Sequence, residues 1–287
     1  ITLGEREVAR ECVGVLGQLA RYIGRDFLVG ALVGVAVQQR ELVLIGEGLD
    51  RNLWTDEDLI WMDGKLQEIA WDEVLQEVLS WEALAALQTF DVLRANKGHV
   101  PGITGGVESD PWQSIVLRFY PSGWYDGNKA AIARLYRELQ DVPEGTSRLW
   151  RQRTLAQRQE AELEAMSRRP SRVFTARITA SLSRACEAMT KAEIGASQAR
   201  IAIALERYRL SRGALPRRLS ELVPEFRPEV PRDPVDGKLM RYRRLAADEG
   251  LLWSVGLDEV DDGGREPATV LDRNKQKGDR VWGDWAR

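Results

Sequence analysis

The chain has 287 residues, enough for one large domain or two ordinary ones, and it can bury an adequate core without disulfides or structural metals. Its net charge of −3 gives no general attraction to nucleic acid or to an anionic membrane, so we expect protein partners and no nucleic acid. One histidine and two cysteines, Cys12 and Cys186, argue against a His-rich metal site and against Cys–His catalysis. The sequence leaves open whether the two cysteines pair.

Helical periodicity dominates the first 189 residues. Residues 4–23, 27–46 and 72–95 repeat apolar side chains at helical spacing, with short loops between them, which predicts antiparallel helix pairs. Residues 27–46 are apolar nearly all round and should be buried, and their most apolar run, 27–37, is too short to cross a bilayer. The first segment has one apolar stripe, formed by Val8, Cys12, Val15, Leu16, Leu19 and Ile23.

Local signals place some helix ends. Thr55 and Asp58 resemble a capping box and predict the start of a short helix. Asp72 and Glu73 lie at the predicted N-terminus of a longer helix, where the helix dipole explains an acidic pair without invoking catalysis. The sequence PSGWYDGN, which ends at Asn128, is typical of a turn, and we expect the next helix to begin there.

Residues 190–213 predict a helix with two apolar stripes, which must therefore be covered on two sides. Charged residues, among them Glu193 and Arg200, lie between the stripes. We interpret this helix as the connection between a helical domain, 1–189, and a smaller module, 190–287. One stripe consists of Ile194, Ile201, Leu205 and Tyr208, and the other of Ala196, Ala199, Ile203 and Leu210.

The composition changes after Gly213. A proline-rich stretch allows one short helical turn. Residues 239–244 alternate, residues 251–255 are apolar, and a short polar loop separates the two segments, which predicts a β-hairpin. The predicted fold is therefore mainly α, with a multi-helix antiparallel domain joined by a long helix to a small α+β module.

The tail is rich in aspartate and glycine. Calcium needs six to eight oxygen ligands on a folded-back loop, and a loop with this composition can supply them. A turn-rich loop without metal explains the same residues, so both interpretations stay open. The aspartates are Asp258, Asp261, Asp262, Asp272, Asp279 and Asp284.

Several motifs in the last third resemble the C-terminal part of the major pseudopilins of type II secretion. They are ALERYRLSRGALP at the end of the long helix, PRDPVDG, LLWSVGLDEVDDGG and the final GDRVW. The whole chain resembles uncharacterised helical proteins of planctomycete and verrucomicrobial type that share this ending. The resemblance implies a calcium site after the hairpin, with its ligands at the positions of Ser254, Asp258, Asp261, Asp262 and Asp279.

Pseudopilins begin with a long apolar helix, whereas here about 190 residues of helical sequence stand in its place, which argues against pilin-like polymerisation. We therefore expect a non-enzymatic interaction or scaffold protein of the bacterial envelope, extracytoplasmic, and tethered to the membrane only through a segment outside this sequence. Two alternatives remain: a carboxylate-dependent hydrolase with a cleft between the two domains, and a component of a type II secretion or pilus-like assembly.

Overall fold

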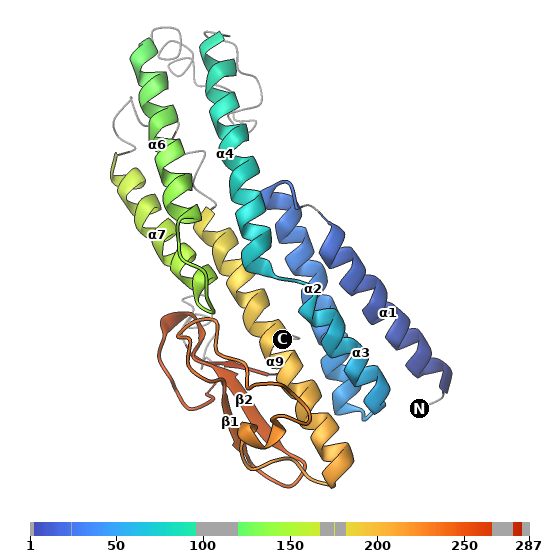
Figure 1. Cartoon of the computed structure of the whole chain (residues 1–287). Coiled ribbons are helices and arrows are strands. Elements are labelled where there is room, and N and C mark those ends of the chain that lie inside the picture. The colour runs from blue at the N-terminus through green and yellow to red at the C-terminus, as the bar shows by residue number, and fades with distance from the viewer. Residues whose placement is uncertain are drawn as a thin grey trace.

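The structure is a computed structural model that describes residues 3–23, 25–95, 120–166, 175, 182–265 and 278–282. Within these residues the protein is mainly helical, with a small three-stranded antiparallel sheet near the C-terminal end (Figure 1). The predicted fold class is confirmed.

Four helices form the first part of the helical domain: α1 (Leu3–Tyr22), α2 (Leu28–Asp50), α3 (Asp56–Gln67) and α4 (Trp71–Ala95). The predicted capping box is present, because the Thr55 side chain accepts from the Asp58 N–H and the Asp58 carboxylate accepts from the Thr55 N–H. α2 runs past its predicted end. Its Gly48 lets the ring of Trp54 approach closely, and the Trp54 indole N–H donates to the Ile45 carbonyl at 3.0 Å.

α2 is the one helix among the described residues that is long and apolar enough to cross a membrane. The apolar run 27–37, which is too short to cross a bilayer, forms only the first part of this longer helix. A core helix passes the same test of length and composition, and the buried face of α2 packs against α1, α4 and α9. This face also carries Gln38 and Glu41, both almost fully buried.

α1 turns its apolar stripe to the outside. Val8, Val15 and Leu19 are exposed together with Cys12, and Tyr22 at the end of the same row is 76% exposed. An apolar stripe usually marks the buried face of a helix, but α1 lies at the outer edge of the molecule and is covered on one side only (Figure 1). The residues it buries lie on the other side of the helix: Val13, Gly17 and Ala20.

Two further helices, α6 (Ser122–Gln140) and α7 (Arg148–Met166), complete this domain. The expected turn at 121–128 is wrong, because α6 begins six residues before Asn128. Tertiary contacts outweigh the local turn propensity here. Asn128 is buried and donates to the hydroxyl of Tyr120 at 3.0 Å and to the Trp124 carbonyl at 2.7 Å, and the Tyr120 ring packs edge-on against Trp124 and Tyr125.

The long helix α9 (Leu182–Arg212) runs through the middle of the molecule, with α2 and α4 on one side and the sheet on the other (Figure 1). It begins eight residues before the predicted start at 190. Both predicted stripes are covered as expected. Ala199 and Ile203 pack with α1, α2 and α3, whereas Ile201, Leu205 and Tyr208 pack with the C-terminal module. Leu210, the last residue of the stripe that contains Ala199 and Ile203, is exposed instead.

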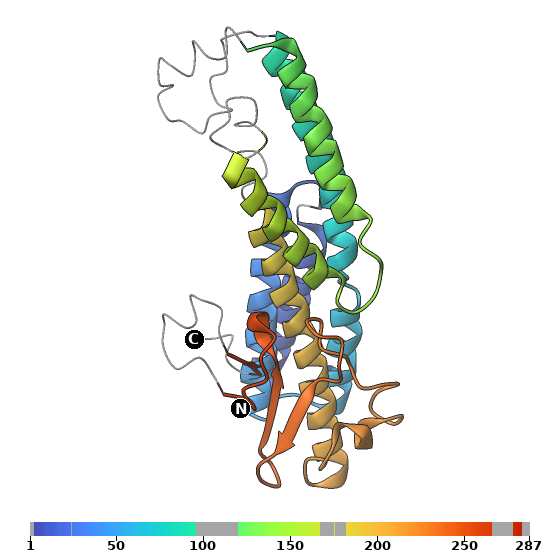
Figure 2. The same ribbon diagram turned by 90° about the vertical axis from the view of Figure 1, so that its left-hand side faces the viewer.

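The C-terminal module contains a 3-10 turn η1 (Leu219–Leu222), strands β1 (Arg241–Arg244), β2 (Gly250–Ser254) and β3 (Arg280–Val281), and a second 3-10 turn η2 (Gly256–Asp258). The predicted hairpin is confirmed, with β1 and β2 antiparallel and Arg241 opposite Trp253. β3 pairs with the other edge of β2. Figure 2 shows the sheet lying along α9 near one end of the molecule. The apolar side chains of this module pack on α9, and they include Leu215, Leu219, Leu222, Met240 and Leu252.

Candidate functional site

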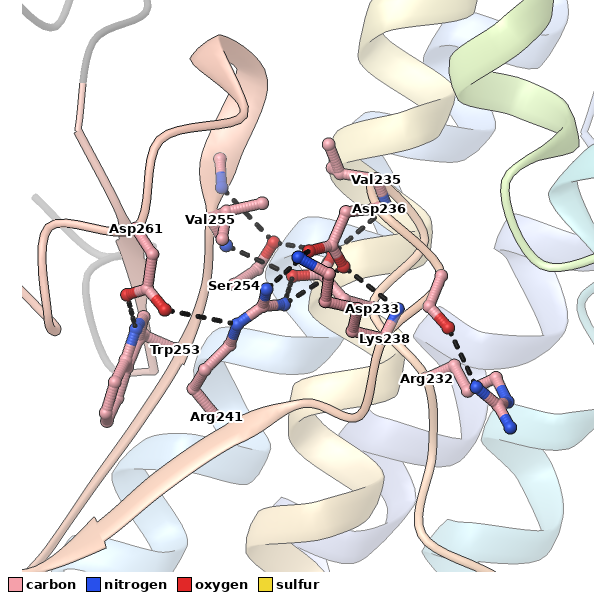
Figure 3. A network of polar contacts seen from close by, with 12 residues as sticks. Arg232, Asp233, Val235, Asp236, Lys238, Arg241, Trp253, Ser254, Val255 and Asp261 are labelled. Carbon is pink, nitrogen blue, oxygen red and sulfur yellow. Dashed lines mark hydrogen bonds and ion pairs between the residues drawn. The ribbon is translucent and has the colours of Figure 1, made fainter.

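The carboxylate of Asp233 is the centre of a buried polar network in the module (Figure 3). It is fully buried and accepts from the backbone N–H of Val235 at 3.0 Å, from the N–H of Val255 at 3.1 Å and from the hydroxyl of Ser254 at 2.9 Å. These bonds join the proline-rich segment to the end of β2. Burial raises the pKa of Asp233 more than its hydrogen bonds and Arg241 lower it.

Arg241 on β1 supplies the positive charge of this network. Its guanidinium lies 2.8 Å from Asp233 and 3.1 Å from Asp236, with a second bond to the other oxygen of Asp236. The same group lies 3.6 Å from Asp261 at the other side (Figure 3). Charge-assisted bonds of this kind are stronger than neutral ones, so one cationic side chain on β1 holds three carboxylates, two from the proline-rich segment and one from the loop after η2.

Ser254 and Asp258, the first two predicted calcium ligands, make hydrogen bonds within the fold. The Ser254 hydroxyl donates to Asp233 and accepts from the Gly256 N–H at 3.3 Å. One oxygen of Asp258 accepts from the Gly278 N–H at 2.8 Å, and the other accepts from the N–H of Val260 at 3.3 Å. The structure therefore brings Asp258 next to the segment that carries Asp279, and each oxygen of Asp258 accepts one hydrogen bond within the fold.

The other three predicted ligands lie close enough to interact electrostatically. Asp261 accepts from the Trp253 indole at 3.0 Å and from a backbone N–H, and these bonds lower its pKa. Asp262 is exposed. Asp279 is 1% exposed, and one of its oxygens accepts from the Gly264 N–H at 2.7 Å. Burial raises the pKa of Asp279, and the charges of Asp261 and Asp262 raise it further.

The second oxygen of Asp279, Oδ1, is buried and has no hydrogen-bond partner within the described part of the chain. An unpartnered carboxylate oxygen next to two further acidic residues fits the charge of a cation. Among the described residues, however, no three acidic, histidine or cysteine side chains come together to hold a metal ion. A calcium ion here would therefore also need backbone carbonyls or water as ligands. Residues 266–277, including Asp272, lie outside the described residues.

A cleft of about 500 Å³ lies where the helical domain meets the module. Its walls are the first turn of α4, the loop before α7, the middle of α9 and the proline-rich segment that follows η1. In Figures 1 and 2 the loop before α7 and the proline-rich segment approach each other beside α9. The cleft is thus built from four segments that are far apart in the sequence.

One face of α9 forms the floor of this cleft with Glu193, Ser197 and Arg200, which are spaced at i, i+4 and i+7. The pKa of Glu193 is raised to about 7, mainly by burial and also by the charge of Asp72 on α4, while Arg200 acts in the opposite direction. Glu193 therefore keeps its proton close to neutral pH, and an acidic neighbour lies beside it.

Arginines line the rest of the cleft. Arg148, the first residue of α7, lies 3.9 Å from the Asp72 carboxylate. Arg200 and Arg227 both lie 3.0 Å from the same oxygen of Asp63. The Arg200–Asp63–Arg227 cluster ties α9 and the proline-rich segment to α3, whereas Arg148 has only the longer contact.

The comparisons with known proteins leave the family open. No protein-family model, no curated protein and no solved structure matches this chain. The resemblance to pseudopilins therefore stays a prediction, and function must be argued from the geometry described above.

Sequence reasoning missed several of these residues. Asp233 lies in one of the motifs that carry the resemblance and Arg241 lies in the first strand of the predicted hairpin, but neither was predicted to have a role. The signal for Asp233 was its place before a proline, where an aspartate commonly bonds a backbone N–H two residues later, as it does with Val235. Glu193 and Arg200 were visible as charges between two apolar stripes. On a helix that is packed on two sides, such positions lie at the boundary between the two packed faces.

Proposed function

We propose that this protein is a non-enzymatic interaction protein of the bacterial envelope, located outside the cytoplasm, in which a pseudopilin-like module is fused rigidly to a helical domain. The observation that carries this proposal is the exposed apolar row on α1. Val8, Cys12, Val15, Leu19 and Tyr22 follow one another at intervals of four and three residues, and every one of them is exposed. Large exposed apolar surfaces mark interaction sites, and this alternation is the spacing by which two helices interlock. The proposed partner segment is therefore an amphipathic helix.

The connection through α9 supports the scaffold role. Side chains of this helix take part in all four hydrophobic clusters of the protein's described part, including one in which Ile194 joins Trp150 of α7 to Val255 and Leu257 of the module. Because both units share one continuous helix and its packing, the module is held in a fixed position relative to the helical domain.

A photo-crosslinking amino acid placed at Val15, in the cells that make the protein, tests the role of the α1 row. We expect a discrete crosslinked product that disappears when Leu19→Glu is added. The same amino acid at Gln157, an exposed position on α7, is the control. Equal products from positions 15 and 157, or no product from position 15, would argue against an interaction surface on α1.

We also propose that calcium stabilises the Asp/Gly loop. The support is the unpartnered buried oxygen of Asp279 beside Asp261 and Asp262. At 100 times its dissociation constant a bound ion adds about 2.7 kcal/mol to stability. The melting temperature should therefore be higher with calcium than with excess EDTA, and Asp279→Asn should remove the difference, whereas the exposed control Asp50→Asn should keep it. Equal melting temperatures with no bound calcium would remove this part of the proposal.

A carboxylate-dependent hydrolase is a second candidate, and one observation favours it. The cleft contains a carboxyl group with a pKa of about 7, Glu193, next to a second carboxyl group, Asp72. Pairs of this kind can divide the acid and base roles of hydrolysis. A screen with fluorogenic peptides and glycosides tests it. Turnover that is lost in both Glu193→Gln and Asp72→Asn would support the candidate, and turnover unchanged in these variants would exclude this cleft as its site.

A further inference from the structure

Two ionisable side chains in the cleft, Arg148 and Glu193, do not pair with each other, and neither has a partner at hydrogen-bonding distance in the described part of the chain. Arg148 is 9% exposed, its Nε atom has no hydrogen-bond partner, and its one ion pair is the 3.9 Å contact with Asp72. Glu193 makes no hydrogen bond or ion pair within 4.0 Å to any described residue, although it lines the same cleft. A desolvated charge such as Arg148 is costly without a close partner, and the partly exposed carboxyl group of Glu193 opens into the same cleft. Together the two groups point to a ligand that binds between them.

Two other arginines of the cleft are already occupied, and Arg232 is exposed and donates to the Gly237 carbonyl at 3.0 Å. Arg200 and Arg227 share the carboxylate of Asp63, and Arg227 also donates to the carbonyls of Arg200 and Glu229, both at 3.3 Å. Arg148 is therefore the buried donor that an incoming anion meets in the cleft. An incoming cation finds its free acceptors at Glu193 and Asp72, on α9 and α4.

We propose that the cleft binds a small zwitterionic ligand of the amino-acid or short-peptide type, with its ammonium group at Glu193 and Asp72 and its carboxylate at Arg148. The cavity volume, about 500 Å³, is in the range of small-molecule sites. The prolines of the facing wall, Pro228, Pro231 and Pro234, offer apolar contacts to the body of the ligand. A simple anion would leave Glu193 unsatisfied, and a simple cation would leave Arg148 unsatisfied.

Binding of this kind carries a proton signature. Glu193 has a pKa of about 7 without ligand, and an ammonium group beside it favours the ionised form and lowers that pKa. Ligand binding at pH 6 therefore releases a proton, and affinity rises as the pH is raised toward 7. The charged groups of the cleft that also enter this balance are Asp72 and Glu73 on α4, Glu144 in the loop before α7, Arg148 on α7, Arg200 on α9, and Arg227, Glu229 and Arg232 on the proline-rich segment.

Calorimetry on the whole chain tests the proposal with three probes: glycyl-leucine, its N-acetyl derivative and its C-terminal amide. We expect the free dipeptide to bind and each blocked form to bind at least about ten-fold more weakly, which is about 1.4 kcal/mol. Titrations at pH 6 in two buffers of different ionisation enthalpy should show proton release for the free dipeptide. No binding of the dipeptide at millimolar concentration would overturn the proposal.

Two variants locate the two contacts. Glu193→Gln should remove both the proton release and the preference for a free amino group, and Arg148→Gln should remove the preference for a free carboxylate. Glu162→Gln and Arg158→Gln, on the exposed side of α7, are matched controls and should change neither. If Arg148→Gln does not fold, the Glu193→Gln result decides. Unchanged preferences in Glu193→Gln, or N-acetyl and amide forms that bind as well as the dipeptide, would contradict a zwitterion site.

The inference concerns binding, and it goes beyond the interaction role proposed above. It is separable from the hydrolase candidate, because turnover is measured independently of binding. A dipeptide that binds at Glu193 without being cleaved supports the site and counts against the hydrolase, whereas cleavage of peptides without the predicted charge preferences would overturn the zwitterion proposal alone.

Discussion

The helical domain and the C-terminal module are stabilised by different physical means, although both pack on α9. The helical domain buries a large apolar cluster that draws on α2, α4, α6, α7 and α9. The module has a smaller apolar cluster, and its loops are held together by the charged network of Asp233, Asp236 and Arg241. A short sheet with long loops has too few apolar side chains to bury all its segments, so hydrogen bonds and ion pairs hold the remainder.

The largest expected effect of a single change is therefore in the module. Asp233→Asn keeps the shape of the side chain but removes the charge that faces Arg241 at 2.8 Å in a fully buried position. Breaking one partner of a buried ion pair costs about 3–5 kcal/mol. Because the network is confined to the module, we expect hydrogen exchange to accelerate there while amides of α4 stay protected. Asp236→Asn should cost less, because Arg241 keeps its ion pair with Asp233. Equally faster hydrogen exchange in the module and in the helical domain would contradict the comparison.

In the helical domain the corresponding change is the loss of an apolar side chain. Leu75 on α4 is fully buried in the large cluster, and Leu75→Ala should lower the free energy of unfolding by about 2–5 kcal/mol, because it removes apolar contacts and leaves a cavity. The exposed Leu84 on the same helix is a matched control, and Leu84→Ala should change stability by less than about 0.5 kcal/mol. Denaturant unfolding measures both, and equal effects would show that the burial of Leu75 is not decisive.

The same contrast explains what the sequence could predict. Most helices of the first domain follow from apolar periodicity, which is a local property of the chain, and so does the doubly covered helix α9. The exposure of the α1 row does not follow, because the spacing of Val8, Val15 and Leu19 is the same whether the partner is part of this chain or another molecule. Periodicity indicates that one face of a helix is apolar, but it does not indicate whether that face packs against the same chain or against another molecule.

The polar sites depend on tertiary contacts and were harder to predict. Three of the five predicted calcium ligands, Asp261, Asp262 and Asp279, interact electrostatically, whereas the oxygens of Asp258 and the hydroxyl of Ser254 make hydrogen bonds within the fold. The cleft joins Asp72 to Glu193 across more than a hundred residues of chain. Helix-dipole reasoning explained Asp72 locally and gave no reason to connect the two.

Glu41 is an exception to this difference between the two units, because it is a carboxyl group buried in the helical domain. Its pKa is raised from 4.5 to about 7, mainly by burial, with Arg21 acting in the opposite direction, and among the described residues its Oε2 atom has no hydrogen-bond partner. Below pH 4.5 the group is protonated in both the folded and the unfolded state and costs nothing. Between pH 4.5 and 7 the unfolded state ionises first, so folding stability falls, and above pH 7 the full penalty remains.

Glu41→Gln should therefore stabilise the protein at pH 8 by up to about 3 kcal/mol more than it does at pH 4, the amount that corresponds to the pKa shift. Unfolding in urea at both pH values measures the difference. Glu47→Gln, at an exposed position on the same helix, should show no such pH dependence. A Glu41→Gln variant with the same pH profile as the wild type would show that Glu41 ionises in the folded protein without cost.

The smallest predicted effect concerns the capping box of α3, where polar bonds stabilise the helical domain as well. Thr55→Ala removes the hydroxyl that accepts from the Asp58 N–H at 3.3 Å and donates to the Asp58 carboxylate at 2.8 Å. Loss of such a cap costs about 1 kcal/mol, while Thr55→Ser keeps the bond and should be nearly neutral. If Thr55→Ala costs as much as Leu75→Ala, the helical domain depends on local polar bonds to the same degree as the module, and the contrast between the two units is lost. If Thr55→Ala lowers stability by only about 1 kcal/mol, the polar bonds of the helical domain determine where its helices begin, while apolar burial determines whether the domain folds.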